Sequence, residues 1–504
     1  MTRGWRVSTY IDDLLTERVS AAPGSALLEH GERRWTSAQV ELLAERGARW
    51  LVDSGVREGD RVLVLGENSD GFIVAVLAAL RAGAVFVPIS PSVAMSMLPF
   101  IVATCSPSVV LADASLMSAY ADHLHGMARR EFAELLTDSA DYGAVRVERR
   151  VDLACIIFTS GSTGTAQGVA CTHSAILVAI RAINTVLEMR AEDRIFCMLP
   201  FSFDYGLYQV FLAMDCGATV VIASTTTTVA NLPRLLLTQA ITVLPIVPAL
   251  SVILLRSGML ERLRPPSLRL VTNTGDLLPM SHQVRLRGLL PDTAIVPMYG
   301  LTECKRVAIL PPRRLDEAPQ GSVGLPLPST EVSLRPLPGA DGYAAEWGEL
   351  LIQGPQLMAG YWEDPTSTRE RFPSHPVTGA RMLRSGDVFT RDGKGFLTFL
   401  GRAESLGHWR GHWMFSAPME DRLAGLPGVD QAAVVVTRQG SETSGIKAFL
   451  CMVESSASME ALARTMIADT YGNPPSIEIR CMPKLPYTPN GKIDRAALSR
   501  VGAP

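Results

Sequence analysis

The sequence lacks the features that would place it among nucleic-acid-binding, membrane or secreted proteins. Its formal net charge is only −3, and no cluster of Lys and Arg interleaved with aromatic residues occurs, so a nucleic-acid-binding surface is not expected. The longest apolar runs, such as residues 72–80, are too short to span a bilayer. The start, MTRGWRVSTYIDDLL, has two Asp where a signal peptide needs its apolar segment. We therefore expect neither nucleic acid nor a membrane as a partner.

The cysteines are also uninformative as a pattern. All 8 are scattered, and none forms a CxxC pair, so neither a zinc site nor a disulfide framework is indicated. Free thiols suit a reducing compartment, and we expect a cytoplasmic protein.

What the sequence does contain is the composition and layering of a large α/β protein. A hydrophobic content of 47% with 19% charged residues is typical of globular proteins, and 504 residues are too many for one core. Short Val/Ile/Leu runs alternate with helical stretches, as expected for parallel strands buried on both faces. The predicted strands lie at residues 60–68, 84–90, 108–113, 154–160, 218–224, 241–248, 268–275 and 294–300.

The pattern changes twice further along the chain. From about residue 321, short strands separated by turns predict a small β-barrel-like part. After Gly401, two paired strands (432–438 and 446–453) and a helix (459–472) predict a small α+β domain. We therefore expect a layered α/β domain over residues 1–401 and a second domain over residues 402–504.

One loop of Ser, Thr and Gly raises the question of function. FTSGSTGTAQG follows a hydrophobic strand directly, and such loops usually present backbone N–H groups and hydroxyls to a phosphate. No Gly-Lys-Ser/Thr follows the strand, as a Walker loop requires. The spacing also differs from the GxGxxG of a dinucleotide site. A flexible linker would not follow a buried strand so closely.

The loop resembles the phosphate-binding loop of adenylate-forming enzymes, the superfamily of acyl-CoA synthetases, peptide-synthetase adenylation domains and luciferases. The family form is [YF]TSGSTGxPKG, and here Ala166 and Gln167 replace Pro-Lys. Further motifs of the family follow in order over nearly the whole chain: TNTGDLLP, MYGLTECKR, GELLIQGPQLMAGYW, RSGDVFTRDGKGFLTFLGR and TPNGKIDR. We expect the loop to hold phosphate through its backbone and hydroxyls.

The resemblance implies a role for each matching residue. Lys492 would be the catalytic lysine, Thr302 would bond phosphate, and Glu303 would hold Mg²⁺, which prefers carboxylate and phosphate oxygen. Asp387 would bind both ribose hydroxyls, and the ring of Tyr299 would pack on adenine. The expected ATP-binding residues are Thr159, Ser160, Gly161, Ser162, Thr163, Gly164, Gly168, Thr274, Gly275, Asp276, Tyr299, Gly300, Asp387 and Arg402.

The implied reaction has two steps. A carboxylate attacks the α-phosphorus of ATP to give an acyl-adenylate and pyrophosphate, and a thiol then displaces AMP. Lys492 lies in the second domain, so the domains must close for the first step, and the mobile second domain would then rotate about Glu404. The thiol would meet a face that includes Arg410 and Gly411, where the surrounding segment departs from the family pattern.

The resemblance is strongest to stand-alone enzymes that load small or β-amino acids onto carrier proteins for nonribosomal peptide or polyketide biosynthesis. Asp204 matches the position that pairs with the substrate ammonium; its alternative role is a helix cap. The expected pocket residues are Asp204, Tyr205, Tyr208, Thr272, Met298 and Arg306. Arg306 could bind a second carboxylate or form a structural salt bridge, and we favour the second role.

Other functions stay open at this stage. The nearest alternative is an acyl-CoA synthetase or acyl-AMP ligase for a non-amino acid. A regulatory homologue without catalysis and a luciferase-like oxidoreductase are the others. Because the chain ends soon after NGKIDRAALSR, we expect any carrier protein to act in trans.

Overall fold

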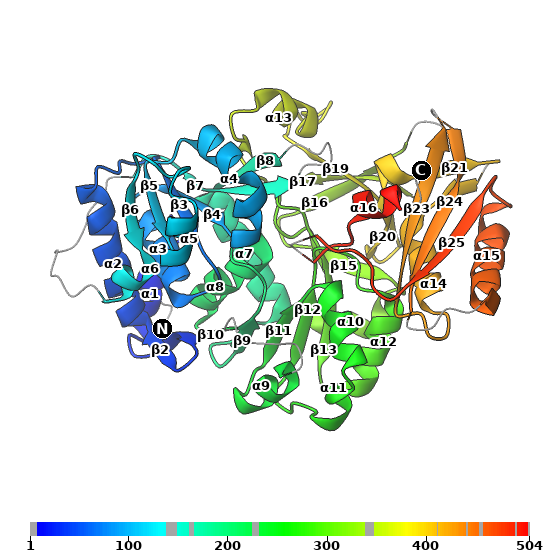
Figure 1. Ribbon diagram of the computed structural model, residues 1–504, viewed down its shortest axis with the longest axis horizontal. Coiled ribbons are helices and arrows are strands. Elements are labelled where there is room, and N and C mark those ends of the chain that lie inside the picture. Colours follow the sequence, from blue (N-terminus) through cyan, green and yellow to red (C-terminus); the bar gives the residue numbers. More distant parts are fainter. Residues whose placement is uncertain are drawn as a thin grey trace.

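The computed structural model describes residues 8–137, 149–160, 166–223, 231–337, 347–410, 412–439, 442–452, 457–488 and 491–501. It is a mixed α/β structure built on two large sheets, with smaller sheets toward the C-terminus (Figure 1). None of the helices in these ranges is long and apolar enough to cross a membrane.

The first large sheet carries the strand that leads into the Ser/Thr/Gly loop. Its strands, in spatial order, are β18 (Gly360–Tyr361), β8 (Ala166–Thr172), β7 (Leu153–Ser160), β4 (Val85–Ile89), β3 (Arg61–Leu65), β5 (Val109–Ala112) and β6 (Ala128–Glu131). The strands from β7 to β6 pair in parallel, whereas β8 returns antiparallel to β7. The two described ends of the loop are therefore the ends of hydrogen-bonded neighbouring strands.

The second large sheet has a parallel half and an antiparallel half. The parallel half contains β1 (Ala26–His30), β10 (Thr219–Ile222), β9 (Arg194–Cys197), β11 (Val243–Ile246), β12 (Leu270–Asn273) and β13 (Ala294–Tyr299). Antiparallel β2 (Arg33–Thr36) closes one edge. The eight predicted strands all occur, as β3, β4, β5, β7, β10, β11, β12 and β13.

The antiparallel half lies where the sequence predicts a small β-barrel-like part. Its strands are β14 (Ala308–Ile309), β15 (Ser322–Pro326), β20 (Leu397–Arg402), β19 (Leu383–Arg391), β17 (Trp347–Gln353) and β16 (Glu331–Arg335). Strand β14 pairs with β13 and joins these strands to the parallel half. The short strands therefore extend the second sheet as an open ladder.

Helices lie between and around the two sheets. Those that follow the parallel strands or open the chain are α1 (Asp13–Ala21), α2 (Ser37–Asp53), α3 (Asp70–Arg81), α4 (Pro91–Cys105), α5 (Ala114–Ala119), α6 (Phe132–Thr137), α7 (His173–Leu187), α8 (Asp204–Cys216), α9 (Leu232–Thr238), α10 (Pro248–Arg256), α11 (Met259–Arg262) and α12 (Met280–Leu289). Helix α3 is apolar on all sides because it contacts β3 and β4 of one sheet and β1 of the other. The short helix η1 (Pro312–Glu317) contacts β13, and α13 (Pro365–Arg371) contacts β18 of the first sheet and β19 of the second.

The C-terminal part has its own sheets and its own buried side chains. It begins with η2 (Ala403–Ser405) and contains β21 (Gly407–Trp409), β22 (His412–Met414), α14 (Ser416–Ala424), β23 (Gln431–Gln439), β24 (Glu442–Cys451), α15 (Ala457–Tyr471), β25 (Ile477–Met482) and α16 (Arg495–Arg500). The predicted strand pair and helix are therefore present. The largest core cluster ends at Leu397, whereas a separate cluster runs from Met414 to Ile479.

Candidate active site

Three cavities meet where the two large sheets and the C-terminal part come together. A cavity of about 20 Å³ lies beside α8 and a larger one of about 540 Å³ borders the C-terminal part. A third, of about 750 Å³, lies between the loop strands β7 and β8 and helix α13. We call these the acid pocket, the nucleotide cavity and the phosphate cavity.

A tight turn after β13 supplies residues to all three cavities. Gly300 opens the turn, and a Cβ there would lie 1.8 Å from the carbonyl oxygen of Lys305, so only glycine fits. Lys305 itself has a left-handed φ of 64°. This folding places Thr302 and Glu303 on the phosphate cavity while Lys305 and Arg306 face the acid pocket.

The acid pocket contains every residue predicted for it. Asp204, Tyr205, Tyr208, Thr272, Met298 and Arg306 line it, together with Ile183, Leu187, Met189, Gln209, Leu212, Val243 and Lys305. The hydroxyl of Tyr205 lies 2.7 Å from the Thr272 hydroxyl, which fixes the tyrosine against β12. A volume of about 20 Å³ is close to that of one or two water molecules, so the protein encloses a very small space here.

The Asp204 carboxylate does not cap α8. Asp204 is the first residue of the helix, Phe203 occupies the N-cap position, and no side chain caps the helix. Asp204 is only 4% exposed, and its carboxylate forms no hydrogen bond or ion pair within the described residues. A buried carboxylate without such a partner is costly, which favours a ligand cation at this position.

Lys305 is a buried cation behind the acid pocket. Its Nζ lies 2.8 Å from Cys171 Sγ and 3.0 Å from the carbonyl oxygen of Thr302. Burial opposes its charged form, but Cys171 and Asp204 outweigh this effect and raise the pKa of Lys305. Burial likewise opposes the thiolate of Cys171, yet its hydrogen bond with Cys155 and the Lys305 ammonium lower the pKa of Cys171 to about 7.

Arg306 lies at the mouth of the acid pocket without a carboxylate partner. Its NH1 donates to the Lys305 carbonyl oxygen at 3.2 Å, and its guanidinium lies 4.7 Å above the Tyr205 ring. The structure shows no salt bridge of Arg306 to any acidic side chain within the described ranges, so the favoured structural role is not supported. Asp204 and Arg306 both line the phosphate cavity as well, so the acid pocket opens toward it.

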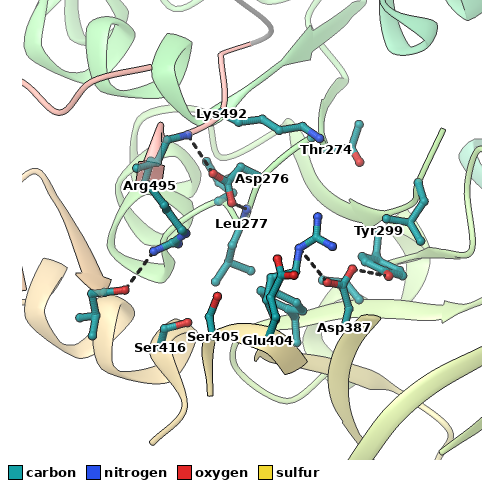
Figure 2. Close-up of a pocket in the computed structure, with 18 of the residues that line it drawn as sticks. Thr274, Asp276, Leu277, Tyr299, Asp387, Glu404, Ser405, Ser416, Lys492 and Arg495 are labelled. Atoms are coloured by element: carbon teal, nitrogen blue, oxygen red, sulfur yellow. Dashed lines mark hydrogen bonds and ion pairs between the residues drawn. The ribbon is translucent and has the colours of Figure 1, made fainter. Parts of the chain in front are cut away.

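In the nucleotide cavity, Asp387 is held between an aromatic hydroxyl and an arginine. Tyr299 donates its hydroxyl to Asp387 Oδ2 at 2.7 Å, and Arg402 Nε lies 3.1 Å from Oδ1 (Figure 2). Burial raises the pKa of Asp387, although Arg402 and Tyr299 oppose this rise. Oδ1 receives no hydrogen bond from the described residues, so it can accept one from a ligand hydroxyl.

The segment that carries Lys492 docks onto the same cavity from the C-terminal part. The backbone N–H of Ile493 donates to Asp276 Oδ2 at 3.2 Å. Gly491 has a φ of 76°, and a Cβ there would lie 2.7 Å from Val247, so glycine permits the close approach. Lys492 consequently points into the cavity toward Thr274 (Figure 2) and lines both the nucleotide and the phosphate cavities.

The phosphate cavity holds the predicted metal residue. Tyr361 donates its hydroxyl to Glu303 Oε1 at 2.8 Å and so orients this carboxylate. No group of three or more His, Cys, Asp or Glu that could bind a metal occurs in the part of the chain that the structure describes. One carboxylate fits Mg²⁺, which is commonly bound by one or two carboxylates together with substrate phosphates.

The loop itself is described only at its two ends. Thr159 lines the phosphate cavity, whereas Gly161, Ser162, Thr163, Gly164 and the side chain of Ser160 lie outside the described residues. Gly168 does not line the phosphate cavity. It lies in β8, where a Cβ would approach Ile156 to 2.8 Å, so it serves close packing.

The remaining predicted residues divide between the cavities and the C-terminal surface. Thr274, Gly275, Gly300, Arg402 and Glu404 line both the nucleotide and the phosphate cavities. Arg410 lies away from them, exposed at the end of a hairpin strand, with its guanidinium 5.2 Å from the Trp409 ring. Gly411 lies outside the described residues.

Sequence reasoning misses several charged residues around the acid pocket and the phosphate cavity. The motifs mark Lys305, at the acid pocket, only as a neighbour of Glu303, and they do not single out Arg335, Arg371 or Arg384 at the phosphate cavity. Arg371 lies outside the motifs, at the end of a short helix. Only the fold brings it to the cavity. The repeated arginines of residues 369–384 are the only available signal.

With this geometry in place, comparisons with known proteins define the class. The family model described as "AMP-binding enzyme" matches residues 15–362. The chain therefore belongs to this family of AMP-forming adenylating ligases.

Individual relatives are known in sequence and in structure. The chain is 27% identical to tyrocidine synthase 3 of Brevibacillus parabrevis over 97% of its own length, but spans only 8% of that protein. It is 33% identical to VinN, whose crystal structure matches 78% of this chain and 98% of VinN with a TM-score of 0.69. VinN has also been solved in complex with L-aspartate. The anthranilate CoA ligase AuaEII, 20% identical over 98% of each chain with a TM-score of 0.87, shares the fold.

Proposed function

We propose that the protein activates a small amino acid that carries a second acidic group, and transfers it as a thioester to the phosphopantetheine thiol of a carrier protein. The observation that carries this proposal is that Asp204 and Arg306, two side chains of opposite charge, line the same pocket. Both are buried at the acid pocket, and each lacks an ion-pair partner among the described residues. A ligand with an ammonium and a carboxylate would supply both partners at once.

The charge around the pocket supports the same class of substrate. Lys305 adds a second positive charge behind Arg306, so an anionic substrate group is favoured there. L-Aspartate, the amino acid bound in the VinN complex, has this combination of one ammonium and two carboxylates.

We assign the first chemical step to the junction of the three cavities. A carboxylate oxygen of the substrate attacks the α-phosphorus of ATP, and the bond to the bridging oxygen breaks to release pyrophosphate. The carboxylate is already ionised at neutral pH, so no general base is required. Lys492 reaches this junction and would screen the charge between the two anions.

Other residues would position the nucleotide. Asp387 would bind the ribose hydroxyls, and Tyr299 would lie against adenine. Glu303, beside Thr302, would hold Mg²⁺ with the phosphate oxygens, where the bound cation neutralises phosphate charge.

We further propose that residues 1–401 and 402–504 act as two domains in the second step. The C-terminal part would leave the position that inserts Lys492 and turn about Glu404, which borders two cavities between the parts. This turn would bring the face that carries Arg410 to the adenylate and the thiol.

Pyrophosphate exchange into ATP tests the proposal. We expect exchange with L-aspartate or a β-amino diacid, and little with succinate, benzoate or an uncharged amino acid such as valine. Loading of a carrier protein by mass spectrometry, compared with coenzyme A as acceptor, identifies the thiol. Exchange that depends only on fatty or aromatic acids would contradict the proposed substrate class and favour an acyl ligase.

A further inference from the structure

The phosphate cavity is lined by several arginines, and most of those near Glu349 and Asp387 are paired with these carboxylates, whereas Arg371 and, at the acid pocket, Arg306 are not. Arg335 forms an ion pair with Glu349, and Arg384 Nε lies 3.5 Å from the same carboxylate. Arg402 likewise forms an ion pair with Asp387. Arg371 lines the cavity too, but no carboxylate of the described residues lies within ion-pair distance of it.

The guanidinium of Arg371 is held in place although its charge is not neutralised. Its NH2 donates to the carbonyl oxygen of Ser385 at 2.8 Å, and the guanidinium lies close enough to Tyr361 to oppose the rise in the pKa of that hydroxyl. Its buried Nε has no hydrogen-bond partner among the described residues. Its NH1 lies against Gly386, 3.1 Å from where a Cβ would be. A fixed arginine with spare donors is suited to bind an oxyanion in a defined geometry.

The position of Arg371 follows from how α13 is anchored. Just before the helix, the Trp362 backbone N–H donates to the carbonyl oxygen of Gly168 at 2.7 Å, which ties the segment to the strand leaving the loop. Asp364 caps the helix through the Ser367 N–H at 2.9 Å. The helix then ends at Arg371, on the same cavity as Thr302 and Glu303.

Gln167 lies beside this anchor. It lines a cavity together with Asp364, and it helps to lower the pKa of Asp364 after the Ser367 contacts. A glutamine cannot neutralise phosphate charge. The position where related loops carry lysine therefore lies near the start of α13, whereas Arg371, which has no carboxylate partner among the described residues, lies at its end.

We propose that Arg371 binds the β- and γ-phosphates of ATP and the departing pyrophosphate, and so supplies the positive charge that Gln167 cannot. This inference rests on the proposed adenylation function, but it concerns the nucleotide alone. The pyrophosphate gains charge as the bond to the α-phosphorus breaks. A guanidinium fixed on the same cavity as Glu303, which would hold Mg²⁺, would stabilise that charge without having to reorganise.

Isothermal titration calorimetry with Mg·ATP and with AMP, without any acid or thiol, tests the proposal. We expect Arg371→Ala to weaken ATP binding about 10- to 100-fold, as for loss of a charged hydrogen bond. AMP binding should change less than about twofold, because AMP lacks both distal phosphates. The matched control is Arg369→Ala, in the same helix and exposed, which should change neither affinity.

Two further variants separate a phosphate contact from a structural one. Arg371→Lys keeps the charge and should recover much of the ATP affinity. In Arg371→Ala, adding Gln167→Lys should also recover it, because a cation returns to the other side of the cavity. AMP binding weakened equally, or no rescue by either lysine, would overturn the proposal. ATP binding with no exchange for any acid would instead contradict the proposed function and leave the role of Arg371 intact.

Discussion

The acid pocket and the nucleotide cavity are built in different ways. The acid pocket has about 20 Å³, and its lining residues lie between Ile183 and Arg306, with the apolar ones part of or packed against one hydrophobic core. The nucleotide cavity has about 540 Å³, and its lining extends from Asn273 to Ser499 across the junction with the C-terminal part. The first is therefore complete without the C-terminal part, whereas the second needs that part docked.

This difference predicts a division of labour between selectivity and chemistry. Changes in the C-terminal segment should alter the rate of adenylation but leave the choice of acid unchanged. Changes in the acid pocket should alter the choice of acid but leave nucleotide binding unchanged. Each prediction below tests one side of this division.

The largest effect is expected for Lys492→Ala. Loss of its charge at the α-phosphate should reduce adenylate formation by about 10²–10³. Transfer from a pre-made adenylate to the thiol should change much less, because Lys492 is proposed to act only in the first step. Single-turnover kinetics of the two half-reactions give this comparison.

Two checks accompany the Lys492 variant. Lys484→Ala removes an exposed lysine of the same C-terminal part and should behave like the unaltered protein. The ratio of rates for two acids should be the same in Lys492→Ala as in the unaltered protein. Equal loss in both half-reactions would instead indicate a misfolded C-terminal part.

Asp204→Ala should have the next largest effect, on the acid side. Without the carboxylate, the substrate ammonium enters the pocket unpaired, which costs roughly 2–5 kcal/mol and raises the KM for the amino acid by about a hundredfold or more. The KM for ATP should stay nearly constant. Asp215→Ala, at the other end of the same helix, is the control for helix stability. Unchanged kinetics in Asp204→Ala would reject the ammonium site.

Tyr208→Phe should have smaller effects, one on stability and one on KM. The buried Tyr208 hydroxyl has no partner among the described residues, so its removal should raise the free energy of unfolding by about 1 kcal/mol. If the substrate bonds this hydroxyl, KM should rise about two- to tenfold in the same variant. Thermal unfolding and exchange kinetics measure the two outcomes. Greater stability with an unchanged KM would show that the hydroxyl does not contact the substrate.

Gln167→Lys in the otherwise unaltered protein should have the smallest effect. Since Arg371 is proposed to supply the charge, a second cation should change the exchange rate by less than about tenfold. A gain of roughly a thousandfold, the size of a whole catalytic contact, would show that the first step is impaired in this protein. That result would favour a regulatory homologue.

Much of the fold could be predicted because its signals are local. The Val/Ile/Leu runs mark the eight predicted strands, and the YGLTE motif marks the turn that borders the cavities. The continuity of the second sheet could not be predicted, because it depends on the two-residue strand Ala308–Ile309. Such a short bridge leaves no periodicity in the sequence.

The site shows the same limit. All six expected acid-pocket residues meet, because they lie on elements whose order the motifs reveal. The partners of the charged groups could not be read from the sequence, since a salt bridge depends on distances between remote segments. The structural ion pair favoured for Arg306 is therefore not found among the described residues. Arg371 is likewise not predicted as a site residue from the sequence.

The most direct test is the ratio of kcat/KM for L-aspartate over L-asparagine in the unaltered protein and in Arg306→Leu. The two amino acids have nearly the same size and differ in the charge of one group. A buried pair that loses one partner costs roughly 2–5 kcal/mol, so the unaltered protein should favour L-aspartate by at least about thirtyfold. Arg306→Leu should remove most of that preference. A ratio near one in both proteins would contradict recognition of a second acidic group by the acid pocket.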